Sequence, residues 1–215
     1  MKKRGGFSNY EYLSEDVIKD RIINKHAKPV KTFGEIRPKD IVPVIAPSRS
    51  GRKAVFPMKW GFTISGKRWP IVNARTETAA SKPTFAESWV RRRCIVPASW
   101  YYEWEHFKSA DGKTKTGDKY LIQPAGSSVT WLCGLYRFED EIPVFTILTR
   151  APGGELAAIH DRMPLIMPDE LVDHWISNAE KPEDLLQYAL TDMMIEKADN
   201  QHLTKAGDEA PLLSW

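Results

Sequence analysis

The amino-acid sequence predicts an α+β fold, in which a curved, largely antiparallel and barrel-like sheet is flanked by helices. Short segments rich in branched and aromatic residues fill the middle of the chain, whereas helix-like segments lie toward its ends. Strands and helices do not alternate as they do in parallel βαβ folds. With 215 residues and no repeat or linker, the chain is expected to form one compact domain over residues 1–215.

Helices are expected near both ends of the chain, with one short helix between them. An amphipathic helix is predicted over residues 14–26, because Ser14 is a favourable cap and apolar residues follow it at helical spacing. Thr84 and Glu87 form a capping-box pattern, which predicts a short helix over residues 84–92. Toward the C-terminus the sequence predicts a helical turn at 153–159, surface helices at 169–176 and 183–190, and an irregular end.

Between these helices, strand-like runs are separated by turn residues. Pro43 and Pro57 fall inside two of the runs and predict edge or bulged strands, because proline lacks the N–H group that a central strand needs. The polar stretch 106–118 is predicted to be a hairpin loop. Strands are expected at 40–45, 53–62, 93–97, 100–104, 119–123, 129–136 and 143–149.

Composition and charge exclude several classes of protein. No segment has the length of a membrane span, and the start lacks the apolar region of a secretory signal. The two cysteines, Cys94 and Cys133, make neither a disulfide framework nor zinc-site spacing. We therefore expect a cytoplasmic monomer without metal or cofactor. The net charge is only +3, but basic residues crowd the first half of the chain, which suits either a polyanion-binding face or solvated surface.

Glu103 and His160 are the candidate acid–base residues. Glu103 lies among the aromatic residues of the run 100–104, where burial is expected to raise its pKa toward neutrality. Histidine is the side chain type suited to proton transfer near neutral pH, which makes His160 a candidate proton shuttle, and the adjacent Arg162 suits a phosphate or a developing oxyanion. The alternatives are a surface glutamate on a half-buried strand and a structural histidine.

Asn73, Arg75 and Glu77 form a second polar cluster. They share one face if the segment is extended. Asn73 is suited to a substrate hydroxyl and Arg75 to a bidentate phosphate contact, with Glu77 orienting Arg75. The alternative is a buried polar network that braces a loop.

Basic and aromatic residues interleave at Lys59-Trp60 and at Lys67-Arg68-Trp69, an arrangement that binds single-stranded nucleic acid through stacking and charge. Trp69 is the candidate for an exposed stacking surface, and Trp60 is expected in the core. The run 91–93 of three arginines is either a solvated helix end or part of the binding face.

The two cysteines lie in strand-like surroundings and are expected to be small core residues. A catalytic pair of Cys94 with His160 is conceivable, but the strand context of Cys94 argues against it.

Six ordered motifs between about Ile36 and Met167 resemble the family of SOS-response-associated peptidases, the SRAP domain. The resemblance implies a compact domain whose curved sheet surrounds a positively charged cleft for abasic sites in single-stranded DNA and for single-strand/duplex junctions. The motifs are Trp60-Gly-Phe62, Asn73-Ala-Arg-Thr-Glu77, Lys82-Pro-Thr-Phe85, Arg93-Cys-Ile-Val-Pro-Ala98, Tyr102-Glu-Trp104 and Ile159-His-Asp-Arg-Met-Pro164.

The resemblance also implies a role for each matching residue in the DNA damage response. Asn73 and Arg75 would hold the N-terminus and a DNA phosphate, Glu103 and His160 would transfer protons, and Arg162 would contact the DNA backbone. Arg4 would match a basic residue that lies near the N-terminus in members of the family.

The family's nucleophile is a cysteine exposed after removal of the initiator methionine, and Lys2 stands at that position here. A ring-opened abasic sugar carries an aldehyde. Without a thiol, the Met1 α-amine, whose reference pKa is about 7.7–8.0, is expected to form an imine with this aldehyde. Such an imine supports lyase chemistry, in which the DNA strand is cleaved. The alternatives are a natural start that differs from the written one, and a non-catalytic module that binds single-stranded DNA.

Overall fold

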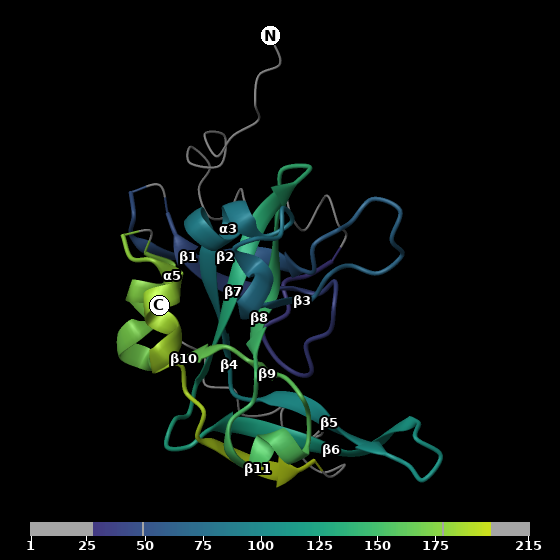
Figure 1. Ribbon diagram of the computed structural model, residues 1–215. Helices are drawn as coiled ribbons and strands as arrows, with labels where there is room; N and C mark the ends of the chain where they lie inside the picture. The colour runs from purple at the N-terminus through teal and green to yellow at the C-terminus, as the bar shows by residue number, and fades with distance from the viewer. Residues whose placement is uncertain (1–27, 49, 178, 199–215) are drawn as a thin grey trace.

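The computed structural model describes residues 28–48, 50–177 and 179–198 (Figure 1). The helix expected at 14–26 and the residues Met1, Lys2 and Arg4 lie outside the described residues, so their predicted roles stay predictions.

Five strands close a barrel. β1 and β2 form an antiparallel hairpin, β2 pairs with β8 in parallel, and β7 pairs antiparallel with both β8 and β4. A pairing between β4 and β1 completes the ring. The predicted curved, barrel-like sheet is therefore confirmed, with one parallel pairing inside the ring. The strands are β1 (Ile41–Pro47), β2 (Lys53–Trp60), β4 (Arg93–Ala98), β7 (Thr130–Glu139) and β8 (Ile142–Arg150).

A separate three-stranded antiparallel sheet lies beneath the barrel, as Figure 1 shows. Its order is β11-β6-β5, and its central strand contributes the fully buried Ile122 to the core. We expected residues 106–118 to be a loop, but the two strands continue through most of that stretch and only a short turn joins them. The strands are β5 (Tyr101–Lys108), β6 (Thr114–Pro124) and β11 (Met193–Lys197).

Short elements complete the fold. The elements predicted at 84–92, 153–159, 169–176 and 183–190 are confirmed as short α or 3-10 helices. Two-residue strands β9 (Met163–Pro164) and β10 (Ile166–Met167) extend the barrel sheet. The others are β3 (Asn73–Arg75), α2 (Thr76–Ala79), α3 (Ala86–Arg91), η2 (Gly154–Ala158), η3 (Asp169–Leu171), α4 (Val172–Ile176), α5 (Pro182–Leu185) and η4 (Leu186–Tyr188).

Alternation along the barrel strands sorts the apolar side chains into two clusters. Val44 and Cys94 belong to the cluster that also holds Ile122 of the three-stranded sheet. Their neighbours Ile45 and Ile95 belong to the other cluster, which receives the helices. Because neighbouring side chains of a strand point to opposite faces, the same strands bury both of their faces.

The prediction that Pro43 and Pro57 mark edge or bulged strands is wrong. The two prolines are paired directly with each other in the β1–β2 hairpin. On its other edge β1 pairs with β4 at Ile45, and β2 pairs with β8 at Lys59 and Trp60. Neither of these pairings includes a proline. Each proline therefore removes no hydrogen bond that a third strand needs.

Arg93 fits neither of the two alternatives for the arginine run, a solvated helix end or part of the binding face. Its side chain is fully buried and donates hydrogen bonds to backbone carbonyls, including Trp175 O at 2.6 Å and Glu180 O at 3.0 Å. Desolvation lowers the pKa of Arg93. Arg93 therefore joins α3 and β4 to α4, where its buried guanidinium satisfies carbonyl groups in the last turns of the two helices and in the segment after α4.

Candidate active site and nucleic-acid interface

One edge of β8 sets the order of the candidate site residues. Trp60, at the end of β2, pairs with Phe145, and Asn73 of β3 pairs with Ile147 two residues further along. Arg75 then pairs with Thr149. At 3.3 Å per residue, the row from Phe145 to Thr149 extends about 13 Å. The segments around Trp60, Asn73 and Arg75, which are separate in sequence, therefore form one line on the barrel.

Asn73 and Arg75 are exposed and point to the same face of β3, while Ala74 between them is buried. This confirms the alternation expected for an extended segment. Among the described residues, no hydrogen bond or ion pair engages either side chain. Both groups are available to a ligand.

Glu77 does not orient Arg75, because the chain turns into α2 at Thr76. Its carboxylate instead accepts two hydrogen bonds from Arg162, from Nη1 and Nη2, each 2.9 Å long. Arg162 Nη2 also donates to Thr149 O at 2.6 Å. This bidentate pair holds the pKa of Glu77 at about 2. Arg162 thus joins the loop that carries His160 to α2.

Glu103 lies on β5 beside the loop that carries His160. Burial raises the pKa of the Glu103 carboxyl, and the nearby His160 ring partly opposes that rise. The raised pKa predicted from the aromatic surroundings is therefore confirmed in direction. A carboxyl with a raised pKa gives up and takes back a proton closer to neutral pH, as an acid–base catalyst must.

The hydrogen bonds of His160 serve both protonation states of its ring. Arg162 N–H donates to His160 Nδ1 at 3.0 Å, so the neutral ring carries its proton on Nε2. A protonated Nδ1 instead faces Asp161 Oδ1 and Arg162 O, each at 3.2 Å. The His160 side chain is 18% exposed. Its ring is therefore held in place while Nε2 stays free of protein partners among the described residues.

His106 is a residue near the site that sequence reasoning missed. Its ring lies 4.8 Å from that of His160, measured between centroids. The His106 N–H donates to Ile159 O at 2.9 Å, which joins β5 to the His160 loop. The signal that we overlooked was the pair of β-branched residues Thr114 and Thr116 in the supposed loop, which favour a strand.

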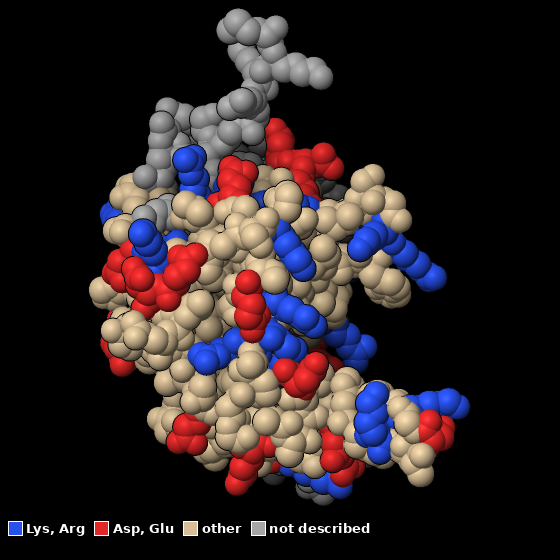
Figure 2. Space-filling model, viewed as in Figure 1, with Lys and Arg blue, Asp and Glu red and all other residues tan. Residues whose placement is uncertain are grey.

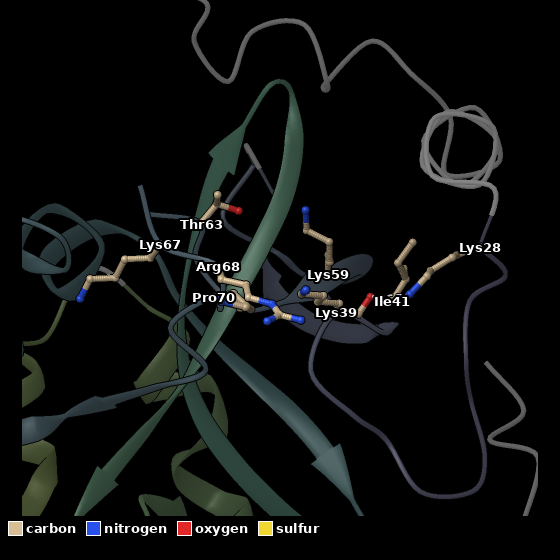
Figure 3. A pocket seen from close by; sticks show the side chains of 9 residues that line it. Lys28, Lys39, Ile41, Lys59, Thr63, Lys67, Arg68 and Pro70 are labelled. Carbon is tan, nitrogen blue, oxygen red and sulfur yellow. Dashed lines mark hydrogen bonds between the residues drawn. The ribbon is translucent and has the colours of Figure 1, made fainter. Parts of the chain in front are cut away.

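A cationic cavity of about 360 Å³ lies at the Trp60 end of the row along β8 (Figure 3). Sequence reasoning singled out Lys59, Lys67 and Arg68 of this lining but missed Lys28 and Lys39. No acidic side chain of the described residues lines it. The charged lining residues are Lys28, Lys39, Lys59, Lys67 and Arg68.

Trp69 stands beside this cavity and is 65% exposed, as its predicted role requires. Lys39 Nζ lies 4.9 Å and Arg68 Cζ 5.6 Å from the centroid of its ring. Figure 3 shows Lys39 and Arg68 turned toward each other and the Lys67 ammonium turned away. Trp60, which we expected in the core, is half-buried, and its ring stacks on that of Phe145 with 6.2 Å between the centroids. Cations around an exposed indole ring suit the faces and phosphates of unpaired nucleotides.

The two cysteines are core residues, as predicted. Cys94 and Cys133 are fully buried, and burial raises the pKa of both thiols. A buried thiol with a raised pKa is a poor nucleophile. The structure therefore excludes a Cys94–His160 catalytic pair.

Figure 2 shows that the molecular surface is hollowed between the barrel and the three-stranded sheet, and that Lys and Arg side chains gather there with a few acidic ones. Among the described residues, no cluster of side chains has the composition of a metal site. No helix in the described part of the chain is long and apolar enough to cross a membrane.

The fold and site define a class of protein: a small β-barrel with a carboxyl–imidazole pair beside a cation-lined face. Residues 9–205 match the family described as SOS response associated peptidase (SRAP). The chain belongs to this family.

Several relatives are named as abasic site processing proteins. YoqW of Bacillus subtilis (strain 168) is 36% identical over 127 residues, which cover 57% of this chain and 54% of YoqW. YedK of Escherichia coli (strain K12) is 33% identical over 128 residues, covering 56% and 54%. The chain thus spans about half the length of the curated relatives that it matches.

Solved structures share the fold. A protein from Bacteroides thetaiotaomicron has a TM-score of 0.66 and 20% identity, with 92% of this chain and 89% of that chain covered. A phage-related protein from Bordetella bronchiseptica has a TM-score of 0.64 and 21% identity, covering 88% and 92%. These similarities support the barrel architecture.

Proposed function

We propose that this protein processes abasic sites in single-stranded DNA as part of the DNA damage response. The observation that carries the proposal is the half-buried Glu103, with its raised pKa, next to the fixed ring of His160. The names of YoqW and YedK as abasic site processing proteins support the same substrate. The proposal places the protein in the cytoplasm, consistent with its two unpaired, buried cysteines.

The row along β8 fits a short single strand. Arg75 and the cationic cavity supply fixed positive charge, and Trp69 supplies a stacking surface for a base. A row of about 13 Å is long enough to contact a short stretch of a single strand. Binding would also accommodate a single-strand/duplex junction, with Trp69 against the last base pair.

The proposed chemistry starts from the ring-opened aldehyde of the abasic sugar. A neutral amine attacks the aldehyde carbon, the C=O bond opens to a carbinolamine, and loss of water gives an imine. Glu103 in its protonated form donates to the departing hydroxyl, and His160 takes the proton that the amine releases. Asn73 holds a sugar hydroxyl in this scheme. The Met1 α-amine is the proposed nucleophile.

The imine has two proposed fates. Attachment of the N-terminus to the sugar persists if a further group traps it. Without trapping, a base removes a proton from the carbon next to the imine, and the 3′ phosphate leaves with the bond electrons, which cleaves the strand. His160 is the proposed base, after the proton that it took from the amine has passed to the Glu103 carboxylate or to water.

The test incubates the protein with single-stranded DNA that carries one abasic site, with and without borohydride, followed by a denaturing gel. Borohydride reduces an imine to a stable amine, so an adduct only with reductant supports the imine route. A heat-stable adduct without reductant supports stable covalent attachment. Binding without adduct or cleavage would refute catalysis and favour a non-catalytic single-stranded DNA-binding module, whose support is the cationic cavity.

Matched variants separate acid–base catalysis from charge. Glu103→Gln keeps the size of the side chain and removes its titration, and it is expected to slow adduct formation about 100-fold or more. Glu105→Gln makes the same change two residues away on β5, where the carboxylate accepts a long hydrogen bond from Asp118 N–H at 3.5 Å. Equal rates for the two variants would contradict the role of Glu103.

A further inference from the structure

The hairpin of β5 and β6 projects beyond the body of the three-stranded sheet, beside the hollow of the surface (Figures 1 and 2). Its outer part, residues 106–116, carries three lysines against one aspartate. Nothing in the acid–base site or the row along β8 uses these lysines.

The register of the hairpin sorts its side chains onto two faces. His106 is opposite Thr116 and Lys108 is opposite Thr114, so these four side chains share one face. A hydrogen bond of 2.7 Å from Lys108 Nζ to Thr114 Oγ1 confirms the placement. We call this the His106 face. Phe107 and Lys115 are opposite each other on the other face.

The His106 face is joined to the acid–base site. The His106 ring contacts the His160 ring at 4.8 Å, and the His106 N–H binds Ile159 O. The irregularity between Trp104 and His106 lies just before this contact, and bulges of this kind re-aim the strand beyond them. Two contacts, one of side chains and one of backbone, therefore fix the base of the hairpin to the loop of the catalytic histidine.

Lys108 extends the positive surface outward from that point. It lies two residues beyond His106, about 7 Å along the strand. It is exposed, and none of the ion pairs among the described residues includes it. Lys113, in contrast, pairs with Asp111 at 3.4 Å. Lys108 is thus an available cation on the face that is anchored at His160.

We propose that the His106 face of the β5–β6 hairpin binds the phosphate backbone of single-stranded DNA next to the reacting abasic sugar. This inference rests on the proposed function. Lys108 supplies the phosphate contact, and Thr114 and Thr116 offer hydroxyl donors beside it. The strand is then held on both sides of the sugar, by the cations along β8 and by the hairpin.

The experiment measures binding by fluorescence anisotropy at several salt concentrations, with a labelled single strand that contains a tetrahydrofuran abasic analogue. This analogue has no aldehyde, so binding is separated from covalent chemistry. Lys108→Ala is compared with Lys115→Ala, which removes the same charge from the opposite, exposed face of the same hairpin. Circular dichroism of each variant confirms that it is folded.

Loss of one phosphate contact is expected to lower the slope of log affinity against log salt by about 0.7 and to weaken binding about fivefold at 0.1 M salt. We expect this for Lys108→Ala and less than a twofold effect for Lys115→Ala. Equal losses in both variants, or no loss in either, would overturn the inference and leave the proposed function intact. If the unaltered protein does not bind the strand at all, the proposed function fails as well.

Discussion

The ion pair between Glu77 and Arg162 gives a quantitative prediction about the site. A carboxyl whose pKa falls from 4.5 to about 2 has its charged form favoured by at most about 3.4 kcal/mol, at 1.36 kcal/mol for each tenfold change in acidity. The Glu77 side chain is 49% exposed, so solvent screening reduces this value. The Arg162 side chain, however, is only 19% exposed and would lose one of its two hydrogen bonds to this residue, because Gln keeps a single acceptor oxygen. We expect Glu77→Gln to cost about 1 to 2 kcal/mol of unfolding free energy.

The assay is urea unfolding of the unaltered protein and Glu77→Gln between pH 7 and pH 3. The folded state lowers the pKa of Glu77, so its stabilisation is complete above about pH 4.5 and is lost as the pH falls through 2. The difference between the two proteins is therefore expected to shrink to less than half of its pH 7 value at pH 3. At neutral pH the melting temperature should drop by about 3 to 6 °C.

A matched control removes a carboxylate that makes no ion pair among the described residues. Glu196→Gln, on the exposed side of β11, is expected to change stability by less than about 0.5 kcal/mol. A difference for Glu77→Gln that stays constant with pH, or grows on acidification, would refute the reasoning about the Arg162 pair.

Three further predictions concern the core and the cationic cavity. Arg93→Met is expected to cost about 3 kcal/mol or more, because it leaves carbonyls of α3, of α4 and of the segment after α4 without their donor; a loss below 1 kcal/mol in urea unfolding would contradict this. Lys59→Ala is expected to lower the salt slope of single-stranded DNA binding by about 0.7, and an unchanged slope would remove Lys59 from the interface. Cys94 and Cys133 should resist thiol reagents at pH 7 in the folded protein and react in denaturant; rapid labelling of the folded protein would contradict their burial.

Local patterns in the sequence predicted much of the fold. Most barrel strands were predicted because branched and aromatic residues alternate between turn residues, and their ends agree within a few residues. β3, β9, β10 and β11 were not predicted. The first three are only two or three residues long, and β11 forms only because β6 offers it an edge. Their existence depends on tertiary pairing, which sequence periodicity does not record.

In the candidate site, too, features that depend on local sequence were predicted, and features that depend on tertiary contacts were not. The raised pKa of Glu103 followed from its immediate neighbours, and the exposure of Trp69 followed from the adjacent turn residues. The partner of Glu77 did not, since Arg162 is 85 positions away in sequence. The buried position of Arg93 could not be predicted either, because its carbonyl partners lie on segments that only the fold brings together.

The most direct test of the proposed site is a crystal structure of Glu103→Gln bound to a single strand with one abasic site. We predict that the open sugar lies within hydrogen-bonding distance of His160 and of the side chain at position 103, with a phosphate at Arg75. A strand bound elsewhere on the surface, with these side chains facing empty solvent, would contradict the proposed function.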